Sequence, residues 1–190
     1  MKRDTVKQQS HTHLRILSDA AYKEETNDGY SLRGAIYCRC SGTSRQSFAD
    51  YSSPVHVVDW ACKSQRHVTR STFSAELLAA GDAFDQGLLT SHLIYEIEFG
   101  PLTSKAARDH RMEGGYIPIS LYVDAKSVLA GLTATFLKTL AEKSLLCHVQ
   151  YLRELLDKGV LEKLYGSIRE TCVLMVLRKE QLTAQLSRRL

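Results

Sequence analysis

The hydrophobic period of the chain changes once, near residue 71, and this change limits the folds that the chain can adopt. Before it, turn-forming stretches separate three segments with the alternation or the β-branched residues of strands, namely 13–19, 31–39 and 55–61. After it, apolar residues recur at helical spacing over 75–97, behind capping residues at 71–74 and ahead of Gly100. Three strands with short links and then a long helix predict an antiparallel meander with helical cover.

The second half of the chain predicts strands that alternate with helices. A polar stretch at 101–116 is expected to be an exposed insertion. The elements expected after it are a strand at 117–123, a short helix at 125–132, an amphipathic helix at 141–157 and a fifth strand that starts over 160–164. Strands reached through right-handed helical crossovers add in parallel. The sequence therefore predicts an α/β fold with a mixed five-stranded sheet, three antiparallel strands plus parallel additions, flanked by helices.

Composition narrows the location of the protein more than its function. The chain has 190 residues, of which 44% are hydrophobic, and this is enough apolar material for one core. No apolar run reaches the roughly 18 to 20 residues that a membrane crossing needs, and polar residues rather than an apolar signal segment follow Met1. We therefore expect an intracellular protein of the cytoplasm or nucleus, neither secreted nor in a membrane. The formal charge of +4 is weak support for a nucleic-acid partner.

The cysteines do not follow the pattern of a zinc site. Cys38 and Cys40 form a lone C-x-C among five cysteines. A structural zinc site needs a second pair of cysteines or histidines at ligand spacing. Free thiols in a reducing compartment are the simpler interpretation.

Three acidic residues occupy positions that the expected topology brings together. Asp19 ends the first expected strand, Asp124 ends the fourth, and Glu76 lies in the first turns of the long helix. In a meander followed by a right-handed crossover, strands one and four can be neighbours, so that their ends lie under the start of the helix. Clustered carboxylates repel unless cations neutralise them, and oxygen ligands suit Mg²⁺ or Mn²⁺. Two such ions can bind the attacking and leaving oxygens of a phosphodiester.

Each of these acids also has an ordinary structural interpretation. Glu76 would complement the dipole of the helix start, Asp124 would cap the next helix, and Asp19 would be a turn residue after a strand. Taken one at a time, these interpretations are at least as good as the functional one. The case for a metal site rests on all three acids falling at converging ends.

Five short segments resemble, in the same order, those of ribonuclease H domains in the Pol polyproteins of copia-type LTR retrotransposons. The segments are LSDAAY at 17–22, VDWACKSQR at 58–66, STFSAEL at 71–77, LYVDAKS at 121–127 and HVQYLRE at 148–154. The resemblance implies a ribonuclease H-like domain over 13–164, in which Asp19, Glu76 and Asp124 are three of the family's four catalytic, metal-binding acids. It also implies Mg²⁺ or Mn²⁺ as the cofactor and hydrolysis of the RNA strand of an RNA–DNA hybrid. A reverse transcriptase domain is expected in the parent polyprotein and is absent from this sequence.

A basic stretch leads into the helix that carries Glu76. Its side chains are expected to hold phosphates next to the metal ions. These side chains are Lys63, Arg66, His67 and Arg70. The alternative is a solvated basic loop without a ligand. His148, in the last resembling segment, is interpreted as a helix-face or core histidine rather than a catalytic one.

The chain departs from the family pattern after its fifth strand. The family's fourth acid follows that strand in a segment like WxDTRDMxADGLTKG, whereas no aspartate occurs here after Asp157. A shifted reading frame can be built from the last base of each codon and the first two bases of the next. In that frame, the codons for Tyr165 and Gly166 can encode Trp, and the codons that follow can encode nearly all of the family segment. We infer that 165–190 is an aberrant tail translated in a shifted frame, with the missing acid encoded across the junction of Leu174 and Met175.

The loss of this acid leaves three functional interpretations open. The first is a ribonuclease that is impaired in this copy. The second is a catalytically dead module that still binds a hybrid or structured nucleic acid, and the third is a pseudogene product without a function. In each of them, 1–12 is a polar tail before the domain. The coding DNA tests the frameshift directly, because third bases that cannot spell the family segment would rule it out.

Overall fold

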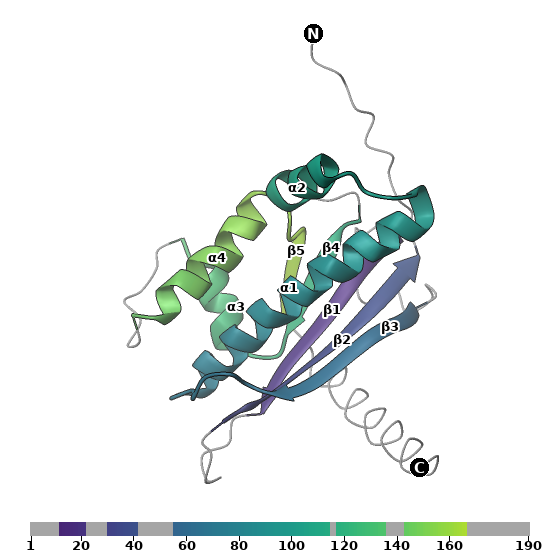
Figure 1. Cartoon of the computed structure of the whole chain (residues 1–190). Helices are drawn as coiled ribbons and strands as arrows, with labels where there is room; N and C mark the ends of the chain where they lie inside the picture. Colours follow the sequence, from purple (N-terminus) through teal and green to yellow (C-terminus); the bar gives the residue numbers. More distant parts are fainter. Residues whose placement is uncertain (1–11, 22–29, 42–54, 115–116, 136–142, 167–190) are drawn as a thin grey trace, which may run out of the picture.

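The computed structural model describes residues 12–21, 30–41, 55–114, 117–135 and 143–166, which form a five-stranded sheet covered by helices (Figure 1). The strands are β1 (Thr12–Ala21), β2 (Leu32–Ser41), β3 (Val55–Ser64), β4 (Ile119–Val123) and β5 (Lys163–Gly166). Their order is β3-β2-β1-β4-β5, in which β2 is antiparallel to β1 and to β3, whereas β4 is parallel to β1 and to β5. The predicted fold class, an α/β fold with three antiparallel strands plus parallel additions flanked by helices, is therefore confirmed.

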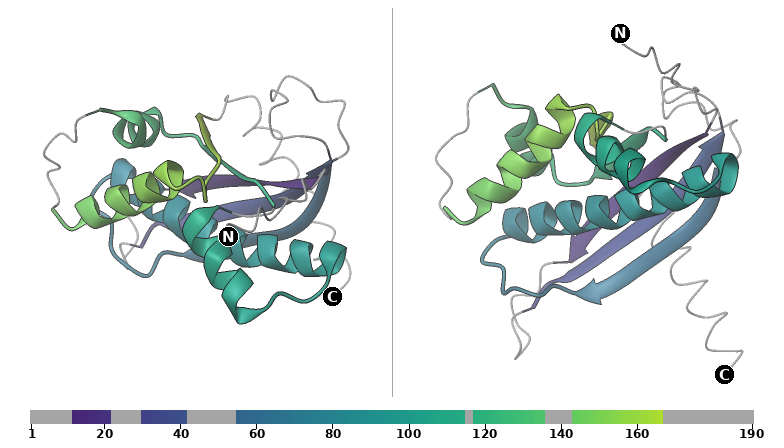
Figure 2. Two further views of the ribbon diagram at one scale, coloured as in Figure 1. Left: turned by 90° about the horizontal axis from the view of Figure 1, so that it is seen from above. Right: turned by 45° about the horizontal axis from the view of Figure 1, so that its top comes forward.

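The helices of the described residues pack on this sheet and on one another. They are α1 (Thr72–Phe99), α2 (Ser104–Glu113), α3 (Lys126–Thr133) and α4 (Leu145–Asp157). Helix α1 crosses β1 and β2 and also contacts β4, α4 packs against α1, and α3 contacts β4 and β5 (Figure 1 and Figure 2). Ser71 caps α1 by accepting a 3.1 Å hydrogen bond from the Ser74 amide, and Gly100 ends the helix with a φ of 95°. Both ends of α1 agree with the caps that the sequence predicts.

The core lies where α1 crosses the sheet. Ile16 of β1 and Tyr37 of β2 are fully buried beneath this helix. Gly87 of α1 lies directly over them, and a Cβ atom built there would be 2.1 Å from Cδ1 of Ile16. The absent side chain at Gly87 therefore sets how closely the helix approaches β1.

We expect Gly87→Ala to lower the free energy of unfolding by about 1–3 kcal/mol, because the added methyl group overpacks the contact with Ile16. Gly81→Ala is the matched control in the same helix, since a Cβ there meets no atom within 4 Å. The higher helix propensity of alanine should make that variant more stable by up to about 1 kcal/mol. Urea denaturation of both variants measures the two changes in the free energy of unfolding. Changes of the same sign would contradict this prediction.

The expectation that 101–116 is an exposed insertion is wrong in part, because α2 forms within it. Thr103 caps this helix by accepting a 3.2 Å hydrogen bond from the Ala106 amide. His110 is buried, and its ring centroid lies 4.8 Å from that of His92 in α1. The polar composition hid the helix because His110 is its only fully buried side chain, which leaves no apolar stripe to recognise.

Several element boundaries also differ from the predicted ones. Strand β1 continues past Asp19 to Ala21, because its pairing with β2 extends over ten residues. Strand β5 begins at Lys163 and runs to Gly166, so it includes the first two residues of the segment 165–190 that is predicted to be aberrant. Helix α4 begins at Leu145, and part of the region predicted as its first turn lies outside the described residues. The rest of the predicted tail, 167–190, and most of the predicted polar tail at 1–12 also lie outside them.

Two further expectations concern cysteines and membranes. The described cysteines are free thiols, as expected, and they are Cys38, Cys40, Cys62 and Cys147. Cys172 lies outside the described residues. Among the helices described, none has the length and apolar character that crossing a membrane requires.

Candidate active site

Asp19 and Asp124 occupy neighbouring positions on two parallel strands. The register of β1 with β4 ends at Ser18 opposite Val123, and the two acids are the next residue on each chain. Adjacent strands are about 4.8 Å apart, so the two backbones lie side by side at this point. Asp124 directly follows β4, as predicted. Asp19 lies within β1, where it pairs with Gly34 of β2, and not at the end of the strand as predicted.

Glu76 approaches the same place from α1. It is the fifth residue of the helix, and only 6% of its surface is exposed. A backbone hydrogen bond from Ala20, the residue after Asp19, supports its carboxylate, whereas its Oε2 atom is buried without a hydrogen-bond partner. A buried, half-satisfied carboxyl group is costly unless a proton or a cation accompanies it.

The electrostatics of Glu76 indicate that the three acids are close to one another. Burial, the nearby charge of Asp19 and, less strongly, the charge of Asp124 together raise the pKa of Glu76 from 4.5 to about 7. The hydrogen bond from Ala20 opposes this rise. Without a cation, the Glu76 carboxyl group is therefore about half protonated near neutral pH.

The ordinary interpretations of the three acids do not fit this geometry. Asp124 is not the cap of α3, because the N-cap position is Ala125 and no side chain makes a capping hydrogen bond there. The effect of the helix dipole is largest in the first turn of a helix, and Glu76 lies beyond the first turn of α1. Asp19 belongs to a strand ladder and not to a turn. None of these roles therefore accounts for the position of the acid.

The donor set fits a divalent cation, although the ligands are not yet gathered. In the described parts of the chain, no three His, Cys, Asp or Glu side chains are placed so that they could hold a metal ion as they stand. The orphaned Oε2 of Glu76 and the mutual repulsion of the acids are nevertheless what a cation would relieve. Carboxylate oxygens are the ligands of Mg²⁺ and Mn²⁺. Binding would have to draw Asp19 and Asp124 toward Glu76.

The predicted basic residues are exposed, with Lys63 in the last two residues of β3 and the others between β3 and α1. Lys63 pairs with Arg33 of β2, which in turn pairs with Ala20 of β1. This row places Lys63 two strands from the acids, at the same end of the sheet. The other predicted residues follow Lys63 along the chain, and they are Arg66, His67 and Arg70. His148 is exposed on α4, as a helix-face histidine would be.

Gln65 anchors this basic stretch, and the sequence analysis did not single it out. Its side chain is buried, and its Nε2 atom donates a 2.6 Å hydrogen bond to the carbonyl of Ala75, the residue before Glu76. Its amide donates to the carbonyl of Ser31 at 2.8 Å, and the Ser31 hydroxyl is 2.6 Å from that of Thr69. Gln65 therefore fixes the basic stretch to the turn of α1 that carries Glu76. The one sequence feature that could have indicated a role for Gln65 is its place in the segment 58–66, which resembles the retrotransposon family.

Comparisons with known proteins give fold-level likenesses only. No protein-family model matches the chain, and no curated protein matches it. A solved structure of LC11-RNase H1 in complex with an RNA/DNA hybrid has a TM-score of 0.46 at 8% identity, covering 82% of this chain and 84% of that one. The N-terminal RNase H domain of Rv2228c from Mycobacterium tuberculosis has a TM-score of 0.44 at 13% identity, covering 82% and 81%. A prototype foamy virus protease–reverse transcriptase has a TM-score of 0.42 at 11% identity, covering 85% and 18%.

The fold class follows from the strand order and strand directions described above, and the candidate site follows from the positions of the three acids.

Proposed function

We propose that the chain is a ribonuclease H-type phosphodiester hydrolase that acts on the RNA strand of RNA–DNA hybrids. The observation that carries this proposal is the buried carboxyl group of Glu76, whose pKa is raised to about 7 and which faces Asp19 and Asp124. Like charges placed together in this way are typical of a site completed by cations. Asp19, Glu76 and Asp124 would hold Mg²⁺ or Mn²⁺, which would supply an activated water and stabilisation of the leaving 3′ oxygen.

In this proposal the residues of the chain have separate tasks. The metal ions are held by Asp19, Glu76 and Asp124. The exposed basic side chains of the stretch before α1 hold phosphates of the substrate. Gln65 positions Glu76 through the Ala75 carbonyl. Glu76 is partly protonated near neutral pH when no metal is bound. A cation must displace this proton in order to bind, so the affinity of the site for the cation should rise with pH through about 7.

The resembling segments support a more specific origin. They favour the ribonuclease H domain of a copia-type retrotransposon, with a reverse transcriptase domain in the parent polyprotein as a partner. The same resemblance supports the proposal that 13–164 is the domain and that 165–190 results from a shifted frame. These residues hold no aspartate that could serve as the fourth acid of the family.

The missing acid supports impaired catalysis in this copy. In the family, this acid helps to hold the metal ion that faces the leaving group. Loss of one strong transition-state contact costs roughly 3 kcal/mol, on the order of a hundredfold in rate. The second candidate function, a nucleic-acid-binding module without activity, is favoured by the fact that no three described acids are placed to hold an ion without rearrangement.

Cleavage of a labelled RNA–DNA hybrid in Mg²⁺ and in Mn²⁺ tests the proposed function, with Asp19→Asn as the control. We expect slow cleavage that the Asp19→Asn variant lacks, because that variant loses a negatively charged ligand without a change in size. Binding without cleavage would favour the second candidate function. Cleavage that persists in the control would place the active site elsewhere or indicate a contaminating nuclease.

A further inference from the structure

Strand β3 forms an open edge of the sheet. It is the outermost strand in the order β3-β2-β1-β4-β5, and no strand of the described residues pairs with its far side (Figure 1). It spans ten residues, Val55–Ser64, about twice the usual length of a strand. The amide of Trp60 donates a 2.8 Å hydrogen bond to the carboxylate of Asp59, so a side chain of the strand itself satisfies this backbone donor. A long edge of this kind is a template for pairing with another chain.

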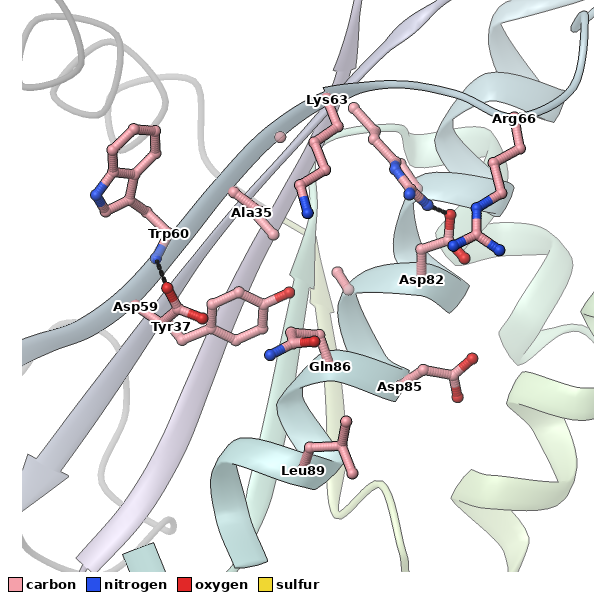
Figure 3. A pocket seen from close by; sticks show the side chains of 15 residues that line it. Ala35, Tyr37, Asp59, Trp60, Lys63, Arg66, Asp82, Asp85, Gln86 and Leu89 are labelled. Carbon is pink, nitrogen blue, oxygen red and sulfur yellow. Dashed lines mark hydrogen bonds and ion pairs between the residues drawn. The ribbon is translucent and has the colours of Figure 1, made fainter. Parts of the chain in front are cut away.

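The face of β3 that turns away from α1 carries exposed apolar side chains. The ring of Trp60 lies on this face, on the opposite side of the strand from Lys63 (Figure 3). It is 52% exposed, and Val55 and Val57 on the same strand are 53% and 42% exposed. Large apolar side chains gathered beside an open edge indicate a surface that another chain covers.

The face of β3 that turns toward α1 carries one acid and one base, four residues apart. Asp59 and Lys63 are both exposed, and they line a groove of about 480 Å³ between the strand and the helix (Figure 3). Residues four apart on a strand are separated by about 13 Å, which is too far for an ion pair. Within the described residues, Lys63 forms no ion pair. The strand therefore presents a negative and a positive charge at a fixed spacing.

This spacing of charges is self-complementary. If two β3 strands pair antiparallel about a two-fold axis at Ala61, Asp59 of each strand lies opposite Lys63 of the other, and two ion pairs form by symmetry. An axis one residue to either side, at Trp60 or at Cys62, does not place the two opposite charges across from each other. Charge complementarity therefore selects a second copy of this strand, in one register, as the partner of the edge.

The backbone and the apolar face fit the same register. The pairing of β3 with β2 is regular over 59–64, because the β-bulge falls at Val58. Trp60 would pair with Cys62 of the partner subunit, so the Trp60 amide could exchange the Asp59 carboxylate for a backbone carbonyl of the partner. That exchange would release the Asp59 carboxylate to the ion pair. The two Trp60 rings would lie on one face of the sheet in diagonal positions, about 7–8 Å apart and within reach of each other.

We propose that two copies of the chain pair edge to edge through β3, antiparallel about Ala61, with crossed Asp59–Lys63 ion pairs and both Trp60 rings on one face. Two five-stranded sheets then form one continuous ten-stranded sheet. A single pair of strands is a small interface, so the dissociation constant should be on the order of 10–100 µM. This inference goes beyond the proposed function and does not depend on it, because it uses the edge of the sheet and not the three acids.

Sedimentation equilibrium of the full chain at about 5 to 500 µM tests the dimer. We expect reversible association, and Lys63→Asp should raise the dissociation constant at least about tenfold, because both ion pairs become repulsions. The charge swap Asp59→Lys/Lys63→Asp should return the dissociation constant to within about threefold of its original value, because it restores both pairs with the charges exchanged. Lys105→Asp is the matched control, since it makes the same change of charge at an exposed lysine of α2, and it should leave the association unchanged.

Disulfide formation tests the register. The axis places residue 61 opposite itself, so Ala61→Cys should give a covalent dimer on mild oxidation, because the Cα atoms of directly opposed strand residues are within disulfide range. A Cys62→Ser/Cys147→Ser background removes the exposed thiols of the described residues. Val55→Cys in the same background is the control and should not cross-link, because residue 55 lies far from its symmetry mate in this register. The inference is overturned if the chain stays monomeric at the highest concentration, if the charge swap does not restore association, or if Val55→Cys cross-links as readily as Ala61→Cys.

Discussion

Replacing Glu76 by glutamine is expected to abolish hybrid cleavage and, at the same time, to stabilise the metal-free protein above neutral pH. Activity should fall at least about a hundredfold, because in the proposed function the variant loses a charged ligand of the cations. Stability should rise because the buried carboxylate, whose Oε2 lacks a partner, is replaced by a neutral amide. A substitution that removes function and adds stability in this way is characteristic of a strained functional site.

The pH dependence of this effect follows from the raised pKa. The folded-state pKa of Glu76 is about 7, above its ordinary value of 4.5, so ionisation favours the unfolded chain. The metal-free protein should therefore lose stability as the pH rises from about 4.5 to about 7, by up to about 3 kcal/mol. The Glu76→Gln variant should lack this loss, and Mg²⁺ should restore stability to the unsubstituted protein above pH 7 by binding the folded state.

Urea denaturation between pH 5 and about 8, with EDTA or with Mg²⁺, measures both effects. Glu154→Gln is a suitable control, because Glu154 is an exposed acid of α4 that forms a surface ion pair with Lys158. This variant should change the free energy of unfolding by less than about 1 kcal/mol. A flat stability profile for the unsubstituted protein, or full cleavage by Glu76→Gln, would contradict the assignment of Glu76 as a buried metal ligand.

Restoring the frame of the C-terminal segment is expected to raise the cleavage rate about a hundredfold. The restored protein would carry the family segment in place of 165–190, including the aspartate that we propose is encoded across the junction of Leu174 and Met175. The physical reason is the fourth carboxylate, which would complete the proposed cation site beside Asp19, Glu76 and Asp124. Single-turnover cleavage of the same hybrid by both proteins measures the gain.

The matched control is the restored protein with that one aspartate changed to asparagine. If the acid is responsible for the gain, the cleavage rate of this control should be close to that of the unrestored chain. Its thermal stability should equal that of the restored protein. Equal rates for the restored protein and this control would instead assign the gain to a better folded C-terminus. No gain on restoration would remove the frameshift as the cause of impaired activity.

The elements of this fold could be predicted where a local pattern encodes them. The alternation before residue 71, the Ser71 cap and Gly100 predicted three strands and the long helix, because strand period and helix capping depend on neighbouring residues alone. Helix α2 was missed because it has one fully buried side chain, His110, whose ring packs against His92 and Tyr95 of α1. No local pattern in a polar segment records such a contact.

The positions of the acids could be predicted from the sequence, whereas other features of the candidate site could not. The adjacency of Asp19 and Asp124 could be expected from the handedness of a crossover connection, and the register of β1 with β4 places them next to each other. Gln65 was missed, because its burial and its hydrogen bond to Ala75 depend on how the end of β3 meets α1. The groove beside α1 was missed for the same reason, since Lys63 and Arg33 become neighbours only through the pairing of β2 with β3.

The sequence by itself thus determined the order of the five strands and of the helices other than α2, the mixed sheet, and the three acids at one end of it. Tertiary structure alone decided that Glu76 is buried beneath its neighbours with a raised pKa, and that Lys63 and Arg66 are left without acidic partners in the described part of the chain. The physical reason is that periodicity and capping are properties of adjacent residues. Desolvation and charge pairing are set by groups that only the packed chain brings together.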